Sequence, residues 1–195
     1  MTRRNRDLLL VALGLIMTAA GLFLRLTEQQ QEQLAGENAQ LLMEAISQQQ
    51  PAVPEAPAPE GDDGDGAAQT LTVMGYDVLG TLRIPSVDID LPVLNSWSYD
   101  LLNVSPCRYS GSIETGDLVI LGHSYRTHLR PLRQVCTGDA VELTDAAGTV
   151  HRYVVAETET LRGSDADALP SPYPLTIFTC TADSRHRFLA RCAEA

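Results

Sequence analysis

The sequence of 195 residues predicts a mainly β fold, a sandwich or barrel of antiparallel strands, behind an N-terminal transmembrane helix. Two observations predict it. Short runs rich in β-branched and apolar residues follow one another from residue 78 to the C-terminus, with Gly, Pro and Asp between them. Near the N-terminus, an apolar run without charge lies between arginines.

The N-terminal segment is predicted to be a single-pass membrane anchor. Residues 8–24 carry no charge, and a helix that crosses the hydrocarbon needs about 17–25 such residues. We therefore expect an anchor at 8–25, with the basic residues 1–7 in the cytoplasm and the rest of the chain outside the cell membrane. A cleaved signal peptide is the alternative, but the apolar run continues past the small residues at 18–20.

Two segments separate this anchor from the folded domain. Residues 26–50 are rich in Gln, Glu, Ala and Leu, which favours a helical stalk. Residues 51–70 combine several prolines with an acidic Gly-Asp run, a composition that predicts a disordered linker. Residues 71–195 suffice for one compact core and are predicted to form a single domain.

Within this domain the sequence predicts short strands, a hairpin turn at 146–148 and two brief helices. The Gly and Pro punctuation favours antiparallel pairing over a parallel α/β sheet. The strands are expected at 78–84, 88–94, 117–122, 140–145, 149–161, 175–180 and 186–192, and the helices at 99–104 and 128–134.

Composition excludes some classes of function. The formal net charge is -11, and the domain has no stripe of basic residues. Nucleic-acid binding is therefore not expected, because neutralising phosphates requires clustered Lys or Arg. The spacings of Cys107, Cys136, Cys180 and Cys192 match no metal motif, so neither a metal nor a cofactor is predicted.

Reactive residues are predicted where strands end. Cys180 closes one apolar run and Arg187 begins the next, so a hairpin would place them near each other. A guanidinium beside the sulfur would stabilise a thiolate or an oxyanion. A cysteine nucleophile also needs a histidine, and His123 directly follows the buried run 117–122. His151 is expected on the solvent face of its strand, and His128 and His186 are expected to be exposed.

Two other readings of Cys180 stay open. An even number of cysteines in an extracellular domain also fits a disulfide framework, in which Cys180 pairs with Cys192 or Cys107 and the domain is a non-catalytic cell-wall binder. The second alternative is that Cys180 is the nucleophile of a different Cys/His enzyme of the cell wall. The L,D-transpeptidases carry an S-H-G-C-x-R run, whereas Phe178-Thr179 precedes the cysteine here.

Four motifs in order give the domain a family resemblance. GTLRIPSVDIDLPV (80–93), the stretch ending in LGHSY (121–125), TIFTC (176–180) and HRFLARC (186–192) resemble those of the sortases, the membrane-anchored cysteine transpeptidases of Gram-positive bacteria. The short connection between Cys180 and Arg187 looks more like class D- or class B-related members than the prototype.

The resemblance implies a closed eight-stranded β-barrel with short helices and assigns site residues. It implies that Cys180 is the nucleophile, His123 the catalytic histidine and Arg187 the essential arginine, with Arg191 and Arg185 as rivals, and that Thr179 lines the substrate site. The implied reaction cleaves the sorting signal of a secreted protein through a Cys180 thioester. The acyl group then passes to an amine of lipid II, peptidoglycan or a pilin lysine. Some members bind calcium, but no acidic loop here supports that.

Overall fold

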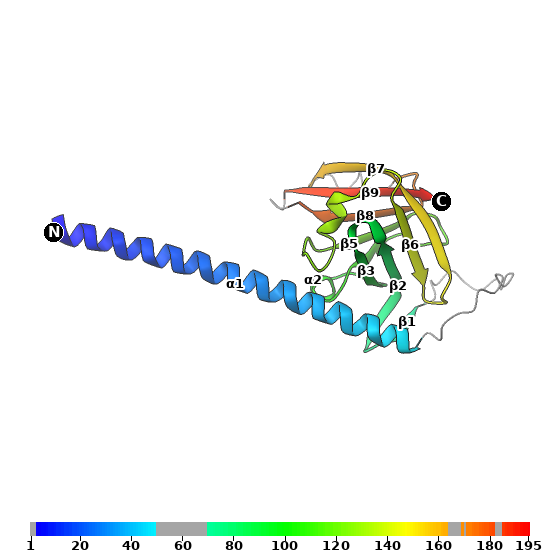
Figure 1. The fold of residues 1–195 in the computed structure, drawn as a ribbon, viewed down its shortest axis with the longest axis horizontal. Helices are drawn as coiled ribbons and strands as arrows, with labels where there is room; N and C mark the ends of the chain where they lie inside the picture. The colour runs from blue at the N-terminus through cyan, green and yellow to red at the C-terminus, as the bar shows by residue number, and fades with distance from the viewer. Residues whose placement is uncertain (1–2, 50–69, 164–168, 170, 182–184) are drawn as a thin grey trace.

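The fold consists of one long helix that lies against a β-barrel (Figure 1). The computed structural model describes residues 3–49, 70–163, 169, 171–181 and 185–195, and the side chains of residues 3–11 are not considered. The helix, α1 (Arg3–Gln49), takes the place of the separate anchor and stalk that the sequence predicts. The linker expected at 51–70 lies outside the described residues, except for Thr70.

The predicted transmembrane anchor at 8–25, and with it the single-pass location in the cell membrane, is wrong. In the part of the chain that the structure describes, no helix is long and apolar enough to cross a membrane. Along α1 the apolar run ends at Leu24, and Arg25, Glu28 and a run of glutamines follow, so the rest of the helix is too polar for the hydrocarbon of a membrane.

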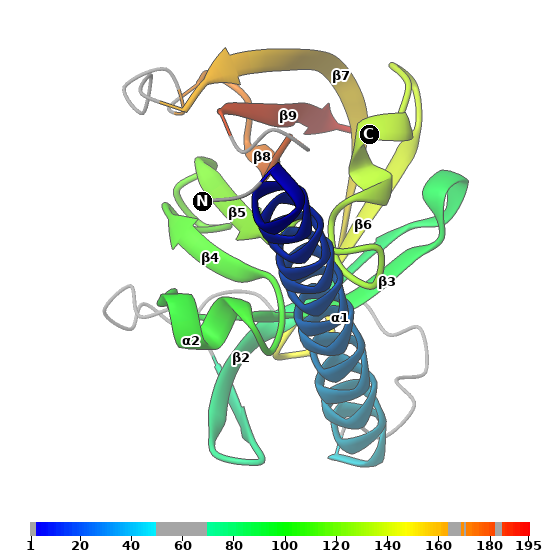
Figure 2. The same ribbon diagram turned by 90° about the vertical axis from the view of Figure 1, so that its left-hand side faces the viewer.

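The C-terminal half of α1 packs on the barrel through a narrow stripe of side chains. The stripe repeats every three or four residues, as one face of a helix requires, and consists of Ala35, Ala39, Leu42 and Ile46. It lies against β1 (Leu71–Val73) and β3 (Ile89–Leu94), and Figure 2 views the helix from its N-terminal end as it runs along the barrel. Leu34 and Leu41 of the same helix are exposed.

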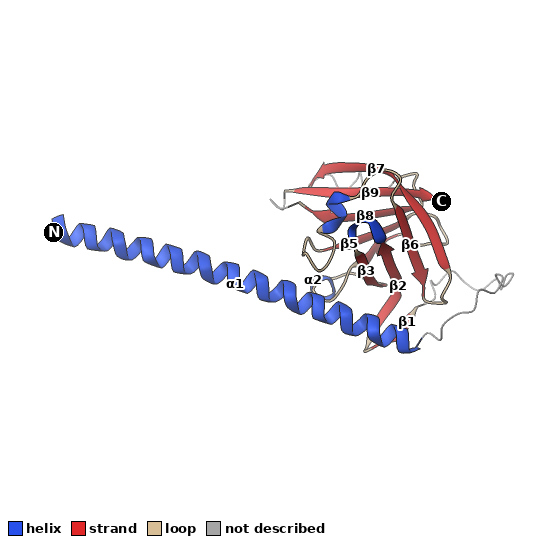
Figure 3. Ribbon diagram, in the orientation of Figure 1, coloured by secondary structure: helices blue, strands red, loops and turns tan. Residues whose placement is uncertain are grey.

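Among the described residues, eight strands close into a barrel, as predicted (Figure 3). They pair in the ring order β2-β3-β4-β5-β8-β9-β7-β6, and β6 returns to β2; β1 extends the sheet beyond β2. The strands not yet located are β2 (Tyr76–Ile84), β4 (Cys107–Ser110), β5 (Leu118–Gly122), β6 (Ala140–Asp145), β7 (Val150–Arg162), β8 (Leu175–Cys180) and β9 (His186–Glu194).

Barrel closure depends on a glycine at the seam between β2 and β6. Gly80 pairs with Asp145, and a Cβ atom added at position 80 would lie 2.1 Å from the carbonyl oxygen of Thr144. Real Cβ atoms do not approach a backbone oxygen that closely. A side chain at this position would therefore push the two strands apart.

Most predicted elements are present, with three differences. The strands β1 and β4 have no counterpart in the prediction. The pairs β3–β4 and β5–β8 are parallel, although antiparallel pairing was expected throughout. The helices expected at 99–104 and 128–134 are shorter, α2 (Tyr99–Leu102) and the 3₁₀ helix η2 (Pro131–Gln134), and a second 3₁₀ helix, η1 (Pro85–Val87), connects β2 to β3.

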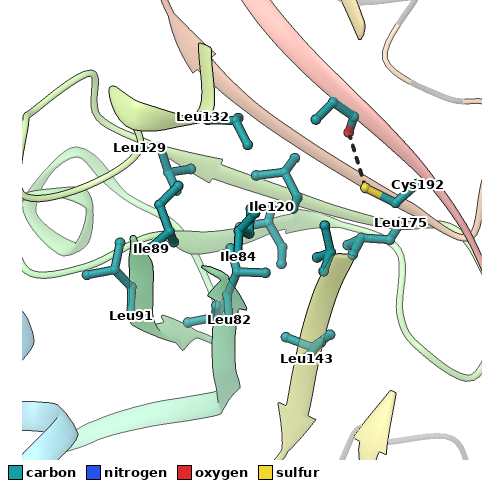
Figure 4. Packing of buried hydrophobic residues seen from close by; sticks show 14 of the residues in the cluster. Leu82, Ile84, Ile89, Leu91, Ile120, Leu129, Leu132, Leu143, Leu175 and Cys192 are labelled. Atoms are coloured by element: carbon teal, nitrogen blue, oxygen red, sulfur yellow. Dashed lines mark hydrogen bonds between the residues drawn. The ribbon is translucent and has the colours of Figure 1, made fainter. Parts of the chain in front are cut away.

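The strands β5, β8 and β9 bury apolar side chains on both faces. Alternate residues point into the barrel, where they join the main core (Figure 4): Leu118, Ile120, Leu175, Ile177, Ala190 and Cys192. The residues between them form a second cluster on the outer face: Val119, Phe178 and Leu189, with Leu169 from the β7–β8 connection and Tyr109, Leu121 and Leu161 at its border. Because both faces are covered, β5 and β8 are nearly continuous apolar runs in the sequence.

Candidate active site

The parallel pairing of β5 and β8 brings His123 and Cys180 to the same edge of the sheet. The register pairs Gly122 with Thr179, so the next residues along the two strands are His123 and Cys180. Side chains alternate between the faces of a strand. His123 therefore shares the outer face with Leu121, and Cys180 shares it with Phe178.

Arg187 lies opposite Cys180 on the third strand. The two residues are Cα partners in the antiparallel β8–β9 pair and so point to the same face. The guanidinium carbon of Arg187 lies 5.7 Å from the centre of the Phe178 ring. One terminal guanidinium nitrogen, Nη1, is buried and has no hydrogen-bond partner in the described structure. A buried donor without an acceptor is costly unless a ligand satisfies it.

Burial of His123, the histidine of this edge, disfavours the protonated form of its ring. Burial lowers the pKa of His123 below its ordinary value of 6.5, because desolvation penalises the charged ring. The ring stacks on Tyr125, with the ring centres 4.7 Å apart. Among the described residues, no carboxylate forms a hydrogen bond with the ring.

Thr179 and Gly122 connect the two reactive strand ends beneath the site. The Thr179 hydroxyl donates a hydrogen bond of 2.9 Å to the carbonyl oxygen of Gly122, and the Thr179 side chain is fully buried. A Cβ atom at position 122 would lie 2.6 Å from the side chain of Leu129. These contacts fix the spacing of the strands that carry His123 and Cys180. The role of Thr179 in lining a substrate site stays a prediction.

The rival arginine Arg191 has a structural position. It lies farther along β9, is 6% exposed, and donates from Nε and Nη2 to Glu159 Oε2 at 3.2 and 3.0 Å. Its Nη1 donates to the carbonyl oxygen of Leu169, at 3.2 Å. Each of its three nitrogens therefore donates a hydrogen bond, either to a residue of β7 or to the β7–β8 connection. Arg185, the other rival, is exposed.

All four cysteines are free thiols in the described structure. Cys107 and Cys192 are buried in apolar clusters, and burial raises the pKa of each thiol to about 12. Cys192 pairs with Leu175, the first residue of β8, so it lies roughly 15 Å from Cys180 along the sheet. A disulfide between them would require a Cα separation below about 7 Å.

The expected exposure of the other histidines is partly wrong. His128 is 1% exposed, because α1 covers it, although its neighbours in the sequence are polar. His151 is half-buried, and its Nε2 lies 2.8 Å from Asp145. His186 is also half-buried. No group of three or more His, Cys, Asp or Glu among the described residues is arranged to hold a metal ion.

One edge of this β-barrel thus combines a free cysteine, a histidine and an arginine with a buried nitrogen that has no partner among the described residues. A sortase-domain family profile matches residues 82–195, more than half of the chain. The chain therefore belongs to the sortase family. No curated protein matches it.

Solved sortase structures share this fold. Sortase A from Corynebacterium diphtheriae is 27% identical, with a TM-score of 0.56 over 62% of this chain and 61% of that one. Sortase A from Listeria monocytogenes is 23% identical, with a TM-score of 0.55 over 60% and 87%. Clostridium perfringens sortase C with the C-terminal cell wall sorting motif is 22% identical, with a TM-score of 0.54 over 62% and 71%. These structures belong to subclasses A and C, and the predicted class D or B relationship stays a prediction.

Proposed function

We propose that this protein is a sortase-type cysteine transpeptidase whose active site consists of Cys180, His123 and Arg187. One observation carries the proposal. Arg187 lies opposite the free Cys180 on the neighbouring strand, and its Nη1 is buried without a hydrogen-bond acceptor among the described residues. An oxyanion formed on a carbonyl that Cys180 attacks would supply this acceptor. Membership of the sortase family supports the assignment of the reaction.

The first half-reaction transfers the acyl group to the enzyme. The Cys180 thiol gives its proton to His123, and the sulfur attacks the carbonyl carbon at the cleavage site of a sorting signal, so that a C–S bond forms and the carbonyl oxygen becomes an oxyanion. The C–N bond then breaks, and His123 gives its proton to the leaving amine. Arg187 donates hydrogen bonds to the oxyanion between these events.

The second half-reaction returns the enzyme to its starting state. An amine attacks the thioester carbonyl, the C–S bond breaks, and His123 accepts the proton of the attacking amine and passes it to the Cys180 sulfur. The substrates we propose are secreted proteins that carry a sorting signal, with lipid II, peptidoglycan or a pilin lysine as the amine. Thr179 lines the substrate site through its main chain, because its hydroxyl is occupied by Gly122.

The test measures acyl transfer to hydroxylamine, a small amine that replaces the natural acceptor. The full chain is incubated with a pool of peptides of varied sorting motif, and hydroxamate products are identified by mass. The expected result is transfer that is abolished in Cys180→Ala and nearly abolished in His123→Ala. Transfer that persists in Cys180→Ala would refute the proposal, as would a parent protein that transfers no peptide of the pool.

A further inference from the structure

Helix α1 docks directly on the segment that follows the catalytic histidine. This segment, residues 124–130, leaves β5 after His123 and returns to it, since the Leu129 N–H donates to the His123 carbonyl oxygen at 3.1 Å. Glu32 of α1 accepts a hydrogen bond from the Arg126 N–H, and the Thr127 hydroxyl donates to the Glu32 carbonyl oxygen at 2.9 Å. The helix is therefore part of the structure around the site.

One connection from α1 to the histidine runs through charges and backbone. Arg130 Nη2 lies 3.6 Å from Glu32 Oε1, and Arg130 Nε donates to the carbonyl oxygen of Ser124 at 2.9 Å. Ser124 is the residue next to His123. The guanidinium thus joins the helix to the backbone at the base of the histidine side chain.

A second connection runs through a stack of rings. His128 Nε2 lies 3.3 Å from the carbonyl oxygen of Ala35, and because a carbonyl only accepts, this nitrogen carries the proton. The His128 ring packs against Tyr125 with ring centres 5.6 Å apart, and Tyr125 packs against His123 at 4.7 Å. Each ring restricts the position of the next.

The charge state of His128 agrees with this arrangement. Burial lowers the pKa of His128 to about 4, so the ring is neutral at physiological pH and donates only through Nε2. Burial also raises the pKa of Tyr125, and the acids Glu32 and Glu28 add to this. Tyr125 therefore stays a neutral ring between the two histidines.

The interface between α1 and the barrel is narrow and only partly filled. The buried stripe of α1 is narrow, and a cavity of about 330 Å³ lies beside it, between the helix, the start of β3 and residues 126–128. The closest approach is at Gly36, where a Cβ atom would lie 2.8 Å from the Thr127 side chain. A glycine inside a helix lowers helix stability, by about 1 kcal/mol relative to alanine. The close packing of α1 on residues 124–130 explains why a glycine occupies this position of the helix.

We propose that α1 is a positioning element of the active site, which holds His123 in place through Glu32–Arg130 and through the His128–Tyr125 stack. The inference rests on the proposed function, because it assumes that His123 transfers protons. Release of the helix would then lower the rate of acyl transfer while the barrel stays folded. Glu32 and His128 are positioning residues, since neither lies at the reacting atoms.

The test compares two identical substitutions in the full chain. Gly36→Leu places a large side chain between α1 and Thr127, whereas Gly21→Leu adds the same side chain on the same helix where nothing lies within 4 Å. Both substitutions raise helix propensity, so a loss of activity in either variant cannot come from unfolding of the helix. We expect kcat to fall about tenfold or more in Gly36→Leu with KM within about twofold, because misplacing a catalytic group slows the chemical step. We expect no change in Gly21→Leu.

An NMR readout separates this inference from the proposed function. The ring C–H signals of His123, assigned with His123→Gln, should shift in Gly36→Leu and not in Gly21→Leu, whether or not a peptide is turned over. Unchanged His123 signals, or equal turnover by the two variants, would overturn the positioning role. A parent protein without Cys180-dependent transfer would overturn the proposed function and leave the NMR result to decide the inference.

A second pair of variants guards against misfolding of Gly36→Leu. His128→Gln keeps a donor near the position of Nε2, whereas His128→Phe keeps a ring against Tyr125 and loses the hydrogen bond to Ala35. If the hydrogen bond to α1 sets the position of His123, the His128→Gln variant should retain a higher kcat than the His128→Phe variant. Equal kcat values at the parent level in both variants would contradict the role of His128.

Discussion

The two ends of the outer face of β8 and β9 are built from similar residues but differ in how their polar groups are satisfied. At one end Arg191 is buried and bonds to Glu159 and to the carbonyl oxygen of Leu169. At the other end Arg187 lies opposite Cys180 with a buried nitrogen that has no acceptor in the described structure. The apolar cluster that contains Phe178 and Leu189 separates the two ends.

This difference underlies the proposal that Arg191 stabilises the fold and Arg187 takes part in the reaction. Burying a donor without an acceptor costs free energy, so a fold retains such a group where something else supplies the acceptor. At the Arg191 end, each guanidinium nitrogen already donates a hydrogen bond within the described structure. The Arg187 end has a free thiol, a guanidinium donor and a histidine at one edge.

The largest expected effect separates the two arginines by activity. Arg187→Lys should lower kcat/KM by about a hundredfold or more, because an ammonium lacks the planar fork that binds a developing oxyanion. Steady-state kinetics with the best peptide measure this. The matched control is Arg191→Lys, which we expect to lose thermal stability and to retain most of its kcat. Equal losses of kcat/KM in both variants would remove the distinction.

A stability measurement tests the Arg191 end. Arg191→Met should lower the free energy of unfolding by about 2 kcal/mol, because the Leu169 carbonyl and the partly exposed Glu159 lose their partner. Urea unfolding of the two methionine variants measures the change, and Arg187→Met is expected to lose less. A less stable Arg187→Met would show that Arg187 also serves the fold.

A smaller effect is expected beneath the site. Thr179→Val has nearly the same shape but leaves the Gly122 carbonyl without its donor, which should cost about 1 kcal/mol of unfolding free energy. The family resemblance instead assigns Thr179 to the substrate site. An unchanged unfolding midpoint with an increased KM would therefore favour direct substrate contact by its side chain.

The smallest effect concerns the titration of His123. Its pKa in the folded protein is below 6.5, so the unfolded chain binds more protons between that folded pKa and pH 6.5. The contribution of His123 to stability is therefore full above pH 6.5 and decreases as the pH falls toward the folded pKa. An NMR titration in Cys180→Ala, which removes coupling to the thiol, should give a midpoint below 6.5. A midpoint at or above 6.5 would mean that the edge is not desolvated.

The sequence predicts the reactive edge because strand ends can be located from local patterns. The apolar runs 117–122 and 175–180 locate the ends of two strands. The sequence therefore places His123 directly after the first strand and Cys180 at the end of the second. The parallel pairing that joins them is a long-range property. The strand β4 has only four residues after Pro106, too few to produce a periodic signal.

The role of α1 could not be predicted from the sequence for a related reason. Two of the four buried positions of its stripe are alanines, Ala35 and Ala39, whereas the more apolar Leu34 and Leu41 are exposed. Small residues pack closely on a neighbour but add little to an apolar pattern. The burial of His128 depends on the same contact, so the local polarity around it gave the wrong prediction.

The most direct test of the central claim is the mass of the intact protein during turnover of a peptide that it cleaves. The reaction is quenched with acid, and the acyl group is located by digestion. The account predicts that the N-terminal fragment of the peptide is attached to Cys180, and that hydroxylamine removes it as the hydroxamate. No cleavage of any peptide in the pool, or an acyl group attached to Cys136 or another residue, would contradict it.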